Sequence, residues 1–169
     1  LFTALPTIDE TGQLAFSLAS DRNGSAVFEV VLRDDAGGND QSVSSQLHID
    51  VGAVNDAPSF SALGDVELVR QGPVSLPWAS DIRPGPDDEA GQSTQFSVQV
   101  LDQSPGLVFV KPPKIEADGQ LKLHVWLNNV RVALATLQVV LKDNGGTANG
   151  GADQSMPLNF TVRVALEPN

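Results

Sequence analysis

The sequence predicts an all-β protein built from β-sandwich repeats in tandem. Three observations lead to this prediction: apolar residues recur at every second position, Gly- and Asn-containing pairs separate the apolar runs, and one part of the chain repeats another. No window longer than ~10 residues carries a capped apolar pattern with the 3.6-residue period of a helix. The pattern therefore favours strands throughout.

Alternating apolar residues mark the expected strands of both copies. Residues two apart point to the same face of a strand, so each alternating set defines one inward face. The first copy carries Leu14, Phe16 and Leu18; Ala26, Phe28, Val30 and Leu32; and Leu47, Ile49 and Val51. The second carries Phe96, Val98 and Val100; Leu121, Leu123 and Val125; Ala135, Leu137, Val139 and Leu141; and Phe160, Val162 and Val164. Trp78 is also expected in the core.

Short turns separate these strands. Asn23-Gly24, Asp118-Gly119 and Asn144-Gly145-Gly146 each place Gly or Asn where the chain must reverse. These residues adopt positive φ at low cost, as tight hairpin turns require. Successive strands are therefore expected to pair as antiparallel hairpins.

The internal repeat is visible in three aligned blocks. Residues 6–14 and 113–121 align without a gap and share five of nine residues. Residues 30–34 then align with 139–143, and residues 40–42 with 153–155. The offset grows only across polar or Gly-rich stretches, where loops tolerate insertions. We infer a tandem array with a period of roughly 110 residues.

The junction between the copies is the Pro-containing segment Val54–Phe60. Residues 1–57 are expected to form the C-terminal part of one β-sandwich repeat, and residues 58–169 one complete repeat. About seven short strands in roughly 110 residues is the strand count of an immunoglobulin-like sandwich. The first copy supplies only about four, so its sheet edges are expected to need pairing by upstream sequence or by another chain.

Composition excludes several classes of function. The chain has 169 residues, with 10 Lys+Arg against 21 Asp+Glu and a net charge of −11. Such a charge repels phosphate backbones and anionic lipid surfaces, so no nucleic-acid partner is expected. No stretch approaches the ~18 apolar residues of a spanning helix, so no membrane insertion is expected. The absence of Cys excludes a disulfide framework and thiolate metal sites, and two His residues make structural zinc nearly impossible.

The residues offer no catalytic site, so the protein is not expected to be an enzyme. His48 and His124 both lie within expected strands, and no Gly-x-Ser-x-Gly motif is present. Carboxylate pairs occur, but in loops without an enclosing cleft. No Gly-rich phosphate loop leads into a helix.

Three segments resemble a known family. Residues Val54–Phe60 read Val-Asn-Asp-Ala-Pro-Ser-Phe, residues 88–92 read Asp-Glu-Ala-Gly-Gln, and residues 143–153 form a Gly-rich acidic loop. Together they resemble the cadherin-like, immunoglobulin-like tandem repeats of very large secreted or surface adhesins, chiefly bacterial. The resemblance implies a rod-forming, adhesive module at the cell surface. Its implied partners are neighbouring repeats, other copies in a filament, and glycans or other cell-surface ligands.

The resemblance also implies calcium at the junction between repeats. Ca²⁺ takes about six to eight oxygen ligands, and acidic residues gather near residues 81–89. The candidate ligands are Asn55, Asp56 and Glu89, followed by Asp87 and Asp88. The junction departs from the cadherin pattern Asp-x-Asn-Asp-Asn-Ala-Pro, since Ala53 stands at the leading acidic position and one Asn is missing. The alternative is that these residues form turns and keep the surface soluble.

A second acidic group flanks the Gly-rich loop of each copy. Its members are Asp34, Asp35 and Asp40 in the first copy and Asp143 and Asp153 in the second. These residues are candidates for holding a cation at the other end of a repeat. The favoured interpretation is a solvated hairpin, because Asp-Gly and Asn-Gly pairs explain the loop without a metal.

Lys122, His124 and Trp126 share the outward face of one expected strand. An exposed Trp beside polar groups stacks on a sugar ring or contacts a protein partner, which gives a second functional hypothesis of a glycan- or protein-binding module. The alternative is a Trp covered by a loop. Asn23 and Asn159 lie in N-glycosylation sequons, which matter only in a eukaryotic secretory pathway, and coincidence is the default interpretation.

Overall fold

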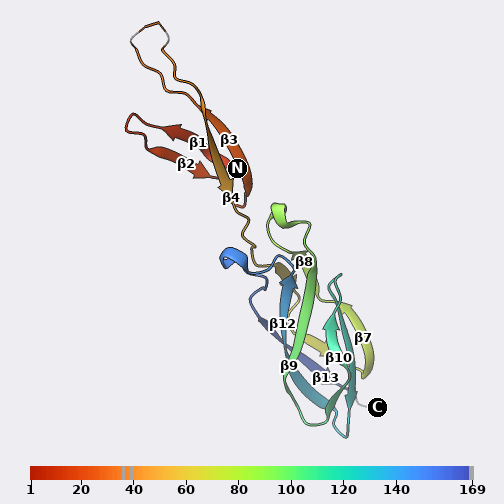
Figure 1. The fold of residues 1–169 in the computed structure, drawn as a ribbon. Coiled ribbons are helices and arrows are strands. Elements are labelled where there is room, and N and C mark those ends of the chain that lie inside the picture. The colour runs from red at the N-terminus through yellow and green to blue at the C-terminus, as the bar shows by residue number, and fades with distance from the viewer. Residues whose placement is uncertain (36, 39, 168–169) are drawn as a thin grey trace. The chain divides into compact units, whose positions relative to one another are not determined.

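The structure is a computed structural model that describes residues 1–35, 37–38 and 40–167 (Figure 1). The chain divides into two compact units, Leu1–Ala53 and Val54–Asn169, which are called the first and second unit below. The division lies four residues before the boundary expected from the sequence, because the junction peptide belongs to the second unit. Each unit is described by itself.

The first unit consists of two antiparallel strand pairs. Strand β1 (Phe2–Ile8) pairs with β2 (Leu14–Leu18), and β3 (Gly24–Val30) pairs with β4 (Ser45–Val51). Phe2 joins the pairs, since its ring lies edge-on to Phe16 at 5.8 Å and to Phe28 at 5.6 Å between ring centroids. Offset and edge-on contacts are the favoured arrangements of aromatic rings.

The second unit is a sandwich of two main sheets. Its strands are β5 (Ser59–Ala62), β6 (Val66–Leu68), β7 (Gly72–Pro77), β8 (Ala79–Arg83), β9 (Thr94–Gln103), β10 (Leu107–Ile115), β11 (Gln120–Leu127), β12 (Val132–Asp143) and β13 (Leu158–Ala165). One sheet has the order β10-β11-β7 and the other β6-β13-β12-β9, while β5 pairs with β8. All pairs are antiparallel except β6 with β13. Two short 3-10 helices, η1 (Asp87–Glu89) and η2 (Ala148–Gly150), lie in loops.

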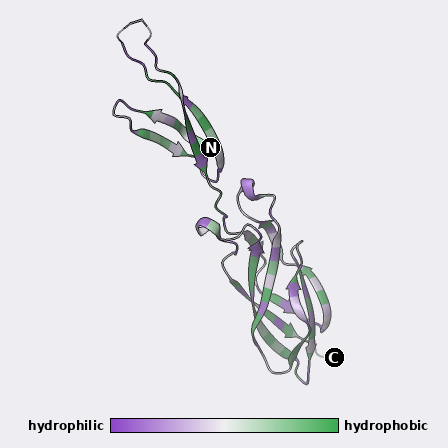
Figure 2. Ribbon diagram, viewed as in Figure 1, coloured by the Kyte–Doolittle hydropathy of each residue, from purple (hydrophilic) through white to green (hydrophobic). Residues whose placement is uncertain are grey.

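The core of the second unit follows the predicted inward faces. The alternating residues of β11, β12 and β13 are buried against one another, and hydrophobic residues follow the strands in Figure 2. Trp78 is buried as predicted; its ring centroid lies 4.4 Å from that of Phe160, and its Nε1 donates a hydrogen bond to the carbonyl oxygen of Gly64. A buried indole thereby keeps its one donor satisfied.

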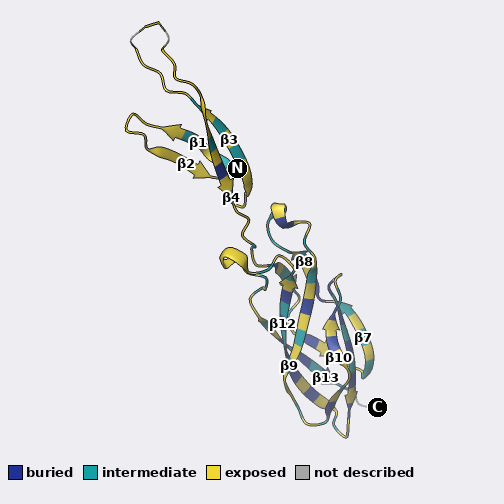
Figure 3. Cartoon of the chain, in the orientation of Figure 1, coloured by how far each residue is buried: buried dark blue, intermediate teal, exposed yellow. Residues whose placement is uncertain are grey.

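The inward faces predicted for the first unit remain largely exposed. Phe16 is 41% exposed and Leu32 is 76% exposed, and most residues of this unit are exposed or intermediate in Figure 3. Only Ile49 is counted as buried among the described residues of this unit. The prediction of an inward, core-forming face is therefore wrong for β2 and for Leu32, because the described residues of this unit cover these side chains only in part.

The two units nevertheless share local structure at aligned residues. The amide of Leu32 donates to Ser42 Oγ and the amide of Ser42 donates to the Leu32 carbonyl, both at 3.0 Å. The amide of Leu141 donates to Ser155 Oγ at 3.0 Å, and the amide of Ser155 donates to the Leu141 carbonyl at 2.9 Å. The same backbone conformation is thus built twice.

Candidate functional site

The junction residue Asn55 is fixed to loops of the second unit through its whole side chain. Its Nδ2 donates to Asp143 Oδ1 at 2.9 Å and to the Ala152 carbonyl at 2.7 Å, while its Oδ1 accepts from Gln92 Nε2 at 2.7 Å. Its own carbonyl accepts from the Ala152 amide at 2.8 Å. Asn55 therefore attaches the junction peptide to these loops, and its side-chain oxygen already has a hydrogen-bond donor.

Two glycines of the Gly-rich loop leave the space that Asn55 fills. A Cβ on Gly145 would lie 1.8 Å from Asn55 Oδ1, and one on Gly151 would lie 2.9 Å from the Asn55 amide nitrogen. Such distances are far below carbon contact distance, so any larger residue there displaces Asn55. Gly145 and Gly151 are thus required by packing, whereas Gly146 and Gly150 of the same loop have the positive φ that its turns need.

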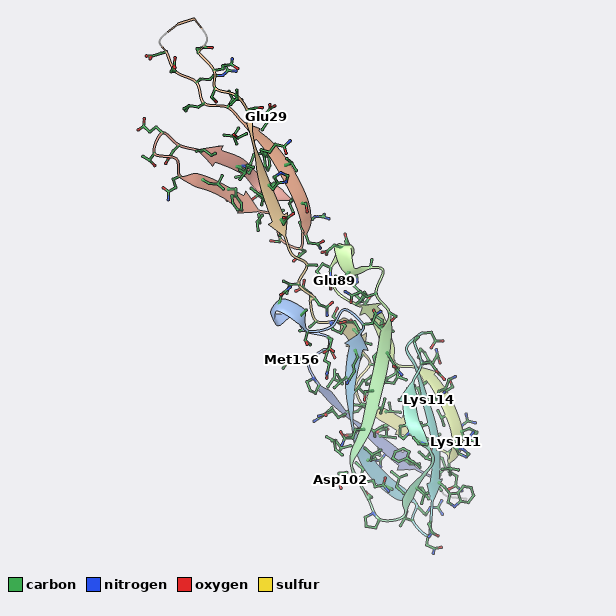
Figure 4. The ribbon with its side chains drawn as sticks, viewed as in Figure 1. Glu29, Glu89, Asp102, Lys111, Lys114 and Met156 are labelled. Carbon is green, nitrogen blue, oxygen red and sulfur yellow. The ribbon has the colours of Figure 1, made fainter. Side chains whose placement is uncertain are left out.

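Glu89 is buried beside the next junction residue. Its side chain lies in the loop carrying η1 and is labelled in Figure 4. The residue is 8% exposed, and its Oε1 accepts a hydrogen bond from the Asp56 amide at 2.9 Å. Gly85 makes room for the carboxylate, since a Cβ there would lie 1.8 Å from Glu89 Oε2. A buried carboxylate is costly unless it is compensated by opposite charge or hydrogen bonds.

Three buried side-chain oxygens around the junction have no hydrogen-bond partner in the described part of the chain. They are Glu89 Oε2, Gln92 Oε1 and Asp143 Oδ2. All three belong to side chains that hold Asn55 or Asp56. Unpartnered buried oxygens are rare in folded proteins, and their concentration at one place points to a missing cationic or donor group.

The donor chemistry fits a hard divalent cation. The carboxylates of Glu89 and Asp143 each have one hydrogen-bonded and one unpartnered oxygen, and the Gln92 carboxamide donates through Nε2 while its Oε1 is unpartnered. Ca²⁺ is bound by such oxygens together with backbone carbonyls and water. Among residues 1–35, 37–38 and 40–167 no three His, Cys, Asp or Glu side chains already form a metal-binding group. Glu89 and Asp143 are therefore the anchor residues that the structure offers.

The predicted metal ligands do not all lie at one place. The structure brings Asp56 and Glu89 into direct contact and joins Asn55 to Gln92, whereas Asp87 and Asp88 are exposed on η1. The solvated hairpin favoured for the second acidic group is wrong for Asp143, and so is the alternative of a cation site at the other end of the repeat, because Asp143 is half-buried and accepts a hydrogen bond from Asn55 of the junction. Gln92 was missed, since an uncharged side chain carries no signal of its own.

The outward face of β11 carries Lys122, His124 and Trp126, as the alternation predicts. Trp126 is 51% exposed, so the alternative of a Trp covered by a loop is wrong. Lys122 and His124 are half-buried, and Lys122 Nζ donates to Ser75 Oγ at 2.7 Å. The binding hypothesis for this face thus has an accessible aromatic ring.

Both sequon asparagines are exposed. Asn23 lies in the turn before β3, and Asn159 lies on β13 where its Oδ1 accepts from Gln138 Nε2 at 3.1 Å. Their glycosylation stays a prediction. No helix among the described residues has the length and apolarity needed to span a bilayer.

The fold is similar to that of solved cadherin domains. The crystal structure of human protocadherin-24 EC1-2 form II matches with a TM-score of 0.57 and 17% sequence identity, over 96% of this chain and 77% of that one. A second crystal structure of human protocadherin-24 EC1-2 matches with a TM-score of 0.54 and 16% identity over the same shares. No protein family and no curated protein matches the sequence. The all-β, cadherin-like sandwich predicted from the sequence is confirmed.

Proposed function

We propose that the chain is part of a series of cadherin-like repeats in an extracellular adhesive protein, with a structural rather than a catalytic role. The cadherin-like fold and the repeated local structure support this proposal. The observation that carries it is the junction peptide: Asn55 and Asp56 are fixed to the second unit by loops that leave buried oxygens unpaired. Such a junction suits a protein whose repeats follow one another along a rod or filament.

Residues 1–57 then represent the C-terminal part of one repeat and residues 58–169 a complete one. The partners are neighbouring repeats of the same chain and other copies in a filament at the cell surface. The two sheets of the second unit supply the mechanical scaffold, because many buried apolar contacts must break together when such a sandwich unfolds.

Calcium belongs to this proposal. Glu89, Asp143 and Gln92 would hold the ion with their unpartnered oxygens. Asp56, whose amide donates to Glu89, would add its own carboxylate. A bound cation supplies the positive charge that two neighbouring carboxylates lack, and so strengthens the attachment of Asn55 and Asp56 to the unit. Asn55 serves as the positioning residue, while the exposed Asp87 and Asp88 add negative potential nearby.

Thermal unfolding in EDTA and then in millimolar Ca²⁺ tests the proposal. A ligand specific to the folded state stabilises it by about 2.7 kcal/mol at a hundred times its Kd, which raises the Tm by several degrees. The intrinsic fluorescence of Trp78 and Trp126 reports the second unit alone, because the chain has only these two Trp residues.

Glu89→Gln is the decisive variant. Glutamine keeps an oxygen for the Asp56 amide but removes the buried charge. We expect this variant to lose the calcium response, and to unfold at a higher temperature than the unsubstituted chain in EDTA, because an uncompensated buried charge has been removed. Asp102→Asn, which changes an exposed carboxylate on β9, is the matched control and should keep the response. Equal Tm values with EDTA and Ca²⁺ would show that the acidic loops are ordinary turns.

A further inference from the structure

A groove lies on the outer surface of the β10-β11-β7 sheet, away from the junction loops. It has a volume of about 420 Å³ and is bordered by Pro73 and Ser75 of β7, Lys111 and Pro112 of β10, and His124 of β11, among others. Ser75 pairs with Lys122 and Pro73 with His124 across the ladder, so these side chains share one face. The groove therefore belongs to the solvent face of the sandwich.

The sequence Lys111-Pro112-Pro113-Lys114 explains why a groove forms there. Neither proline has an amide hydrogen to donate to β11, and a proline inside a strand is tolerated only at an edge or a bulge. The register between β10 and β11 slips twice in this stretch, once between Phe109 and Lys111 and once between Lys111 and Lys114. Pro113 turns inward and is buried, whereas Pro112 lines the groove. The bulge thus separates the outward side chains of the two strands.

The charge of the groove is opposite to that of the chain. The protein carries a net charge of −11 and only four lysines, yet Lys111, Lys114 and Lys122 all line this groove. Figure 4 labels Lys111 and Lys114, which both come from β10. Solubility does not require cations to gather at one cavity of an acidic protein, so their convergence indicates an anionic ligand.

These cations are only partly neutralised by the protein. Lys114 Nζ lies 2.6 Å from Glu116 Oε1, and Lys122 is held by Ser75 Oγ. Lys111 makes no ion pair or side-chain hydrogen bond within the described residues, and its side chain is exposed. Ser75 and Lys122 are already ordered before a ligand arrives, which lowers the entropy lost on binding. Lys111 supplies the free charge.

An aromatic surface continues the groove along β11. Trp126 is the next outward residue after His124, and its cross-strand partner Val108 is also exposed. Outward residues two apart on a strand lie roughly 7 Å from each other. An exposed indole next to hydroxyl and ammonium groups is suited to stacking against the apolar face of a sugar ring.

We propose that this groove binds an acidic polysaccharide, with Lys111 and Lys122 contacting its carboxylate or sulfate groups and Trp126 stacking on a neighbouring sugar ring. An acidic peptide would use the lysines but has no need of the indole. A long polyanion such as a nucleic acid would meet the negative charge of the remaining surface, whereas a short saccharide segment contacts only the groove. The site is separate from the calcium site and does not rest on it.

Binding of defined polymers to the full 169-residue chain tests this proposal. The probes, each used as a short oligomer, are heparin as a sulfated chain, oligogalacturonate as a carboxylated chain, dextran as a neutral one and polyglutamate as an acidic peptide. Each is measured by calorimetry at low ionic strength with EDTA present. EDTA removes any contribution of calcium, so the result is independent of the proposed function. We expect heparin or oligogalacturonate to bind and dextran and polyglutamate to bind far more weakly.

Variants locate the site. Lys111→Gln should weaken binding by about tenfold, as loss of one charge-assisted contact predicts, and the double variant with Lys122→Gln by more. Trp126→Ala should weaken saccharide binding several-fold. Lys111 and Trp126 are exposed, so neither change should lower the Tm. Lys142→Gln, on β12 of the other sheet, removes the same charge outside the groove and should change nothing.

Three results would overturn the proposal. The first is failure of both acidic polysaccharides to bind the unsubstituted chain. The second is an equal loss in Lys142→Gln and Lys111→Gln, which would indicate attraction by overall charge only. The third is tighter binding of polyglutamate than of either saccharide, which would make the groove a peptide site.

Discussion

Leu32 and Leu141 occupy the same place in the two units and have opposite environments. Each lies beside a serine whose hydroxyl accepts its amide hydrogen at 3.0 Å, yet Leu32 is 76% exposed and Leu141 is fully buried. The local conformation is therefore set by nearby residues alone. Burial is set by which other strands are present.

The difference in burial comes from strands that pair with the second unit's copy of the shared structure. In the second unit β12 pairs with β9, β13 with β6, and β11 with β7. The aligned strands of the first unit are β3, β4 and β2, and each has one partner strand among the described residues. Unpaired strand edges bind other strands readily, so we expect these edges to pair with a further strand.

The largest effect should come from truncating the two leucines. Leu141→Ala removes a fully buried side chain and should lower the free energy of unfolding of the second unit by about 3 kcal/mol. Leu32→Ala should change stability by less than about 0.5 kcal/mol, because little area is lost from the interior. Urea unfolding followed by Trp fluorescence measures the first variant, and circular dichroism of the whole chain measures the second. Similar losses in both would mean that the first unit has a closed core.

A smaller difference in stability is expected between alanine variants of the two glycines in the matching turns. Gly12 and Gly119 both have a φ of +82°. A Cβ on Gly119 would lie 2.0 Å from the Ala79 carbonyl oxygen, whereas one on Gly12 would meet nothing within 4 Å. Both alanine variants bear the strain of a positive φ, about 1–2 kcal/mol. Gly119→Ala adds a backbone collision and should cost roughly 2 kcal/mol more.

Urea unfolding also measures the stability of the two glycine-to-alanine variants. The carbonyl of Gly119 accepts the amides of Trp78 and Ala79, so a shift of this turn also weakens the contact with the segment preceding β8. Trp fluorescence should therefore change in Gly119→Ala even before unfolding. Equal costs for the two variants would mean that the second unit adjusts without strain.

The sequence was sufficient for the strands because their signal is local. Leu121, Val139 and Val162 follow the period of two and are buried as predicted. The same pattern failed for Phe16 and Leu32, since alternation reports which face is apolar and not whether anything covers it. Which strands cover that face depends on pairing between residues far apart in the sequence, and a local pattern does not report it.

The candidate site was only half predictable for the same reason. Glu89 and Asp56 were found from charge and resemblance, and they are in contact. Asp143 was expected in a solvated hairpin, because a sequence does not show which residues lie beside the end of a strand of twelve residues. Lys111 drew no attention, since its role follows from a register slip beside two prolines.

The smallest predicted effect concerns the turn that joins β1 to β2. Asp9 Oδ1 accepts hydrogen bonds from Thr11 Oγ1 at 2.6 Å and from the amides of Thr11 and Gln13 at 2.9 Å. The Thr11 hydroxyl above all, and then the Gln13 amide, hold the pKa of the Asp9 carboxyl below its usual value. The aligned residue of the second unit, Glu116, instead forms an exposed ion pair with Lys114.

The lowered pKa of Asp9 predicts that the first unit loses a little stability at low pH. Because the folded state lowers the pKa of Asp9, the contribution to stability is complete above the unfolded-state pKa near ~4 and is lost as the pH falls through the folded-state value. The carboxyl is fully exposed, so solvent screening keeps the change in stability small. Titration of the Asp9 carboxyl carbon by NMR should give a midpoint that rises in Thr11→Val. An unchanged midpoint would show that the Thr11 hydroxyl does not hold the Asp9 carboxylate in solution.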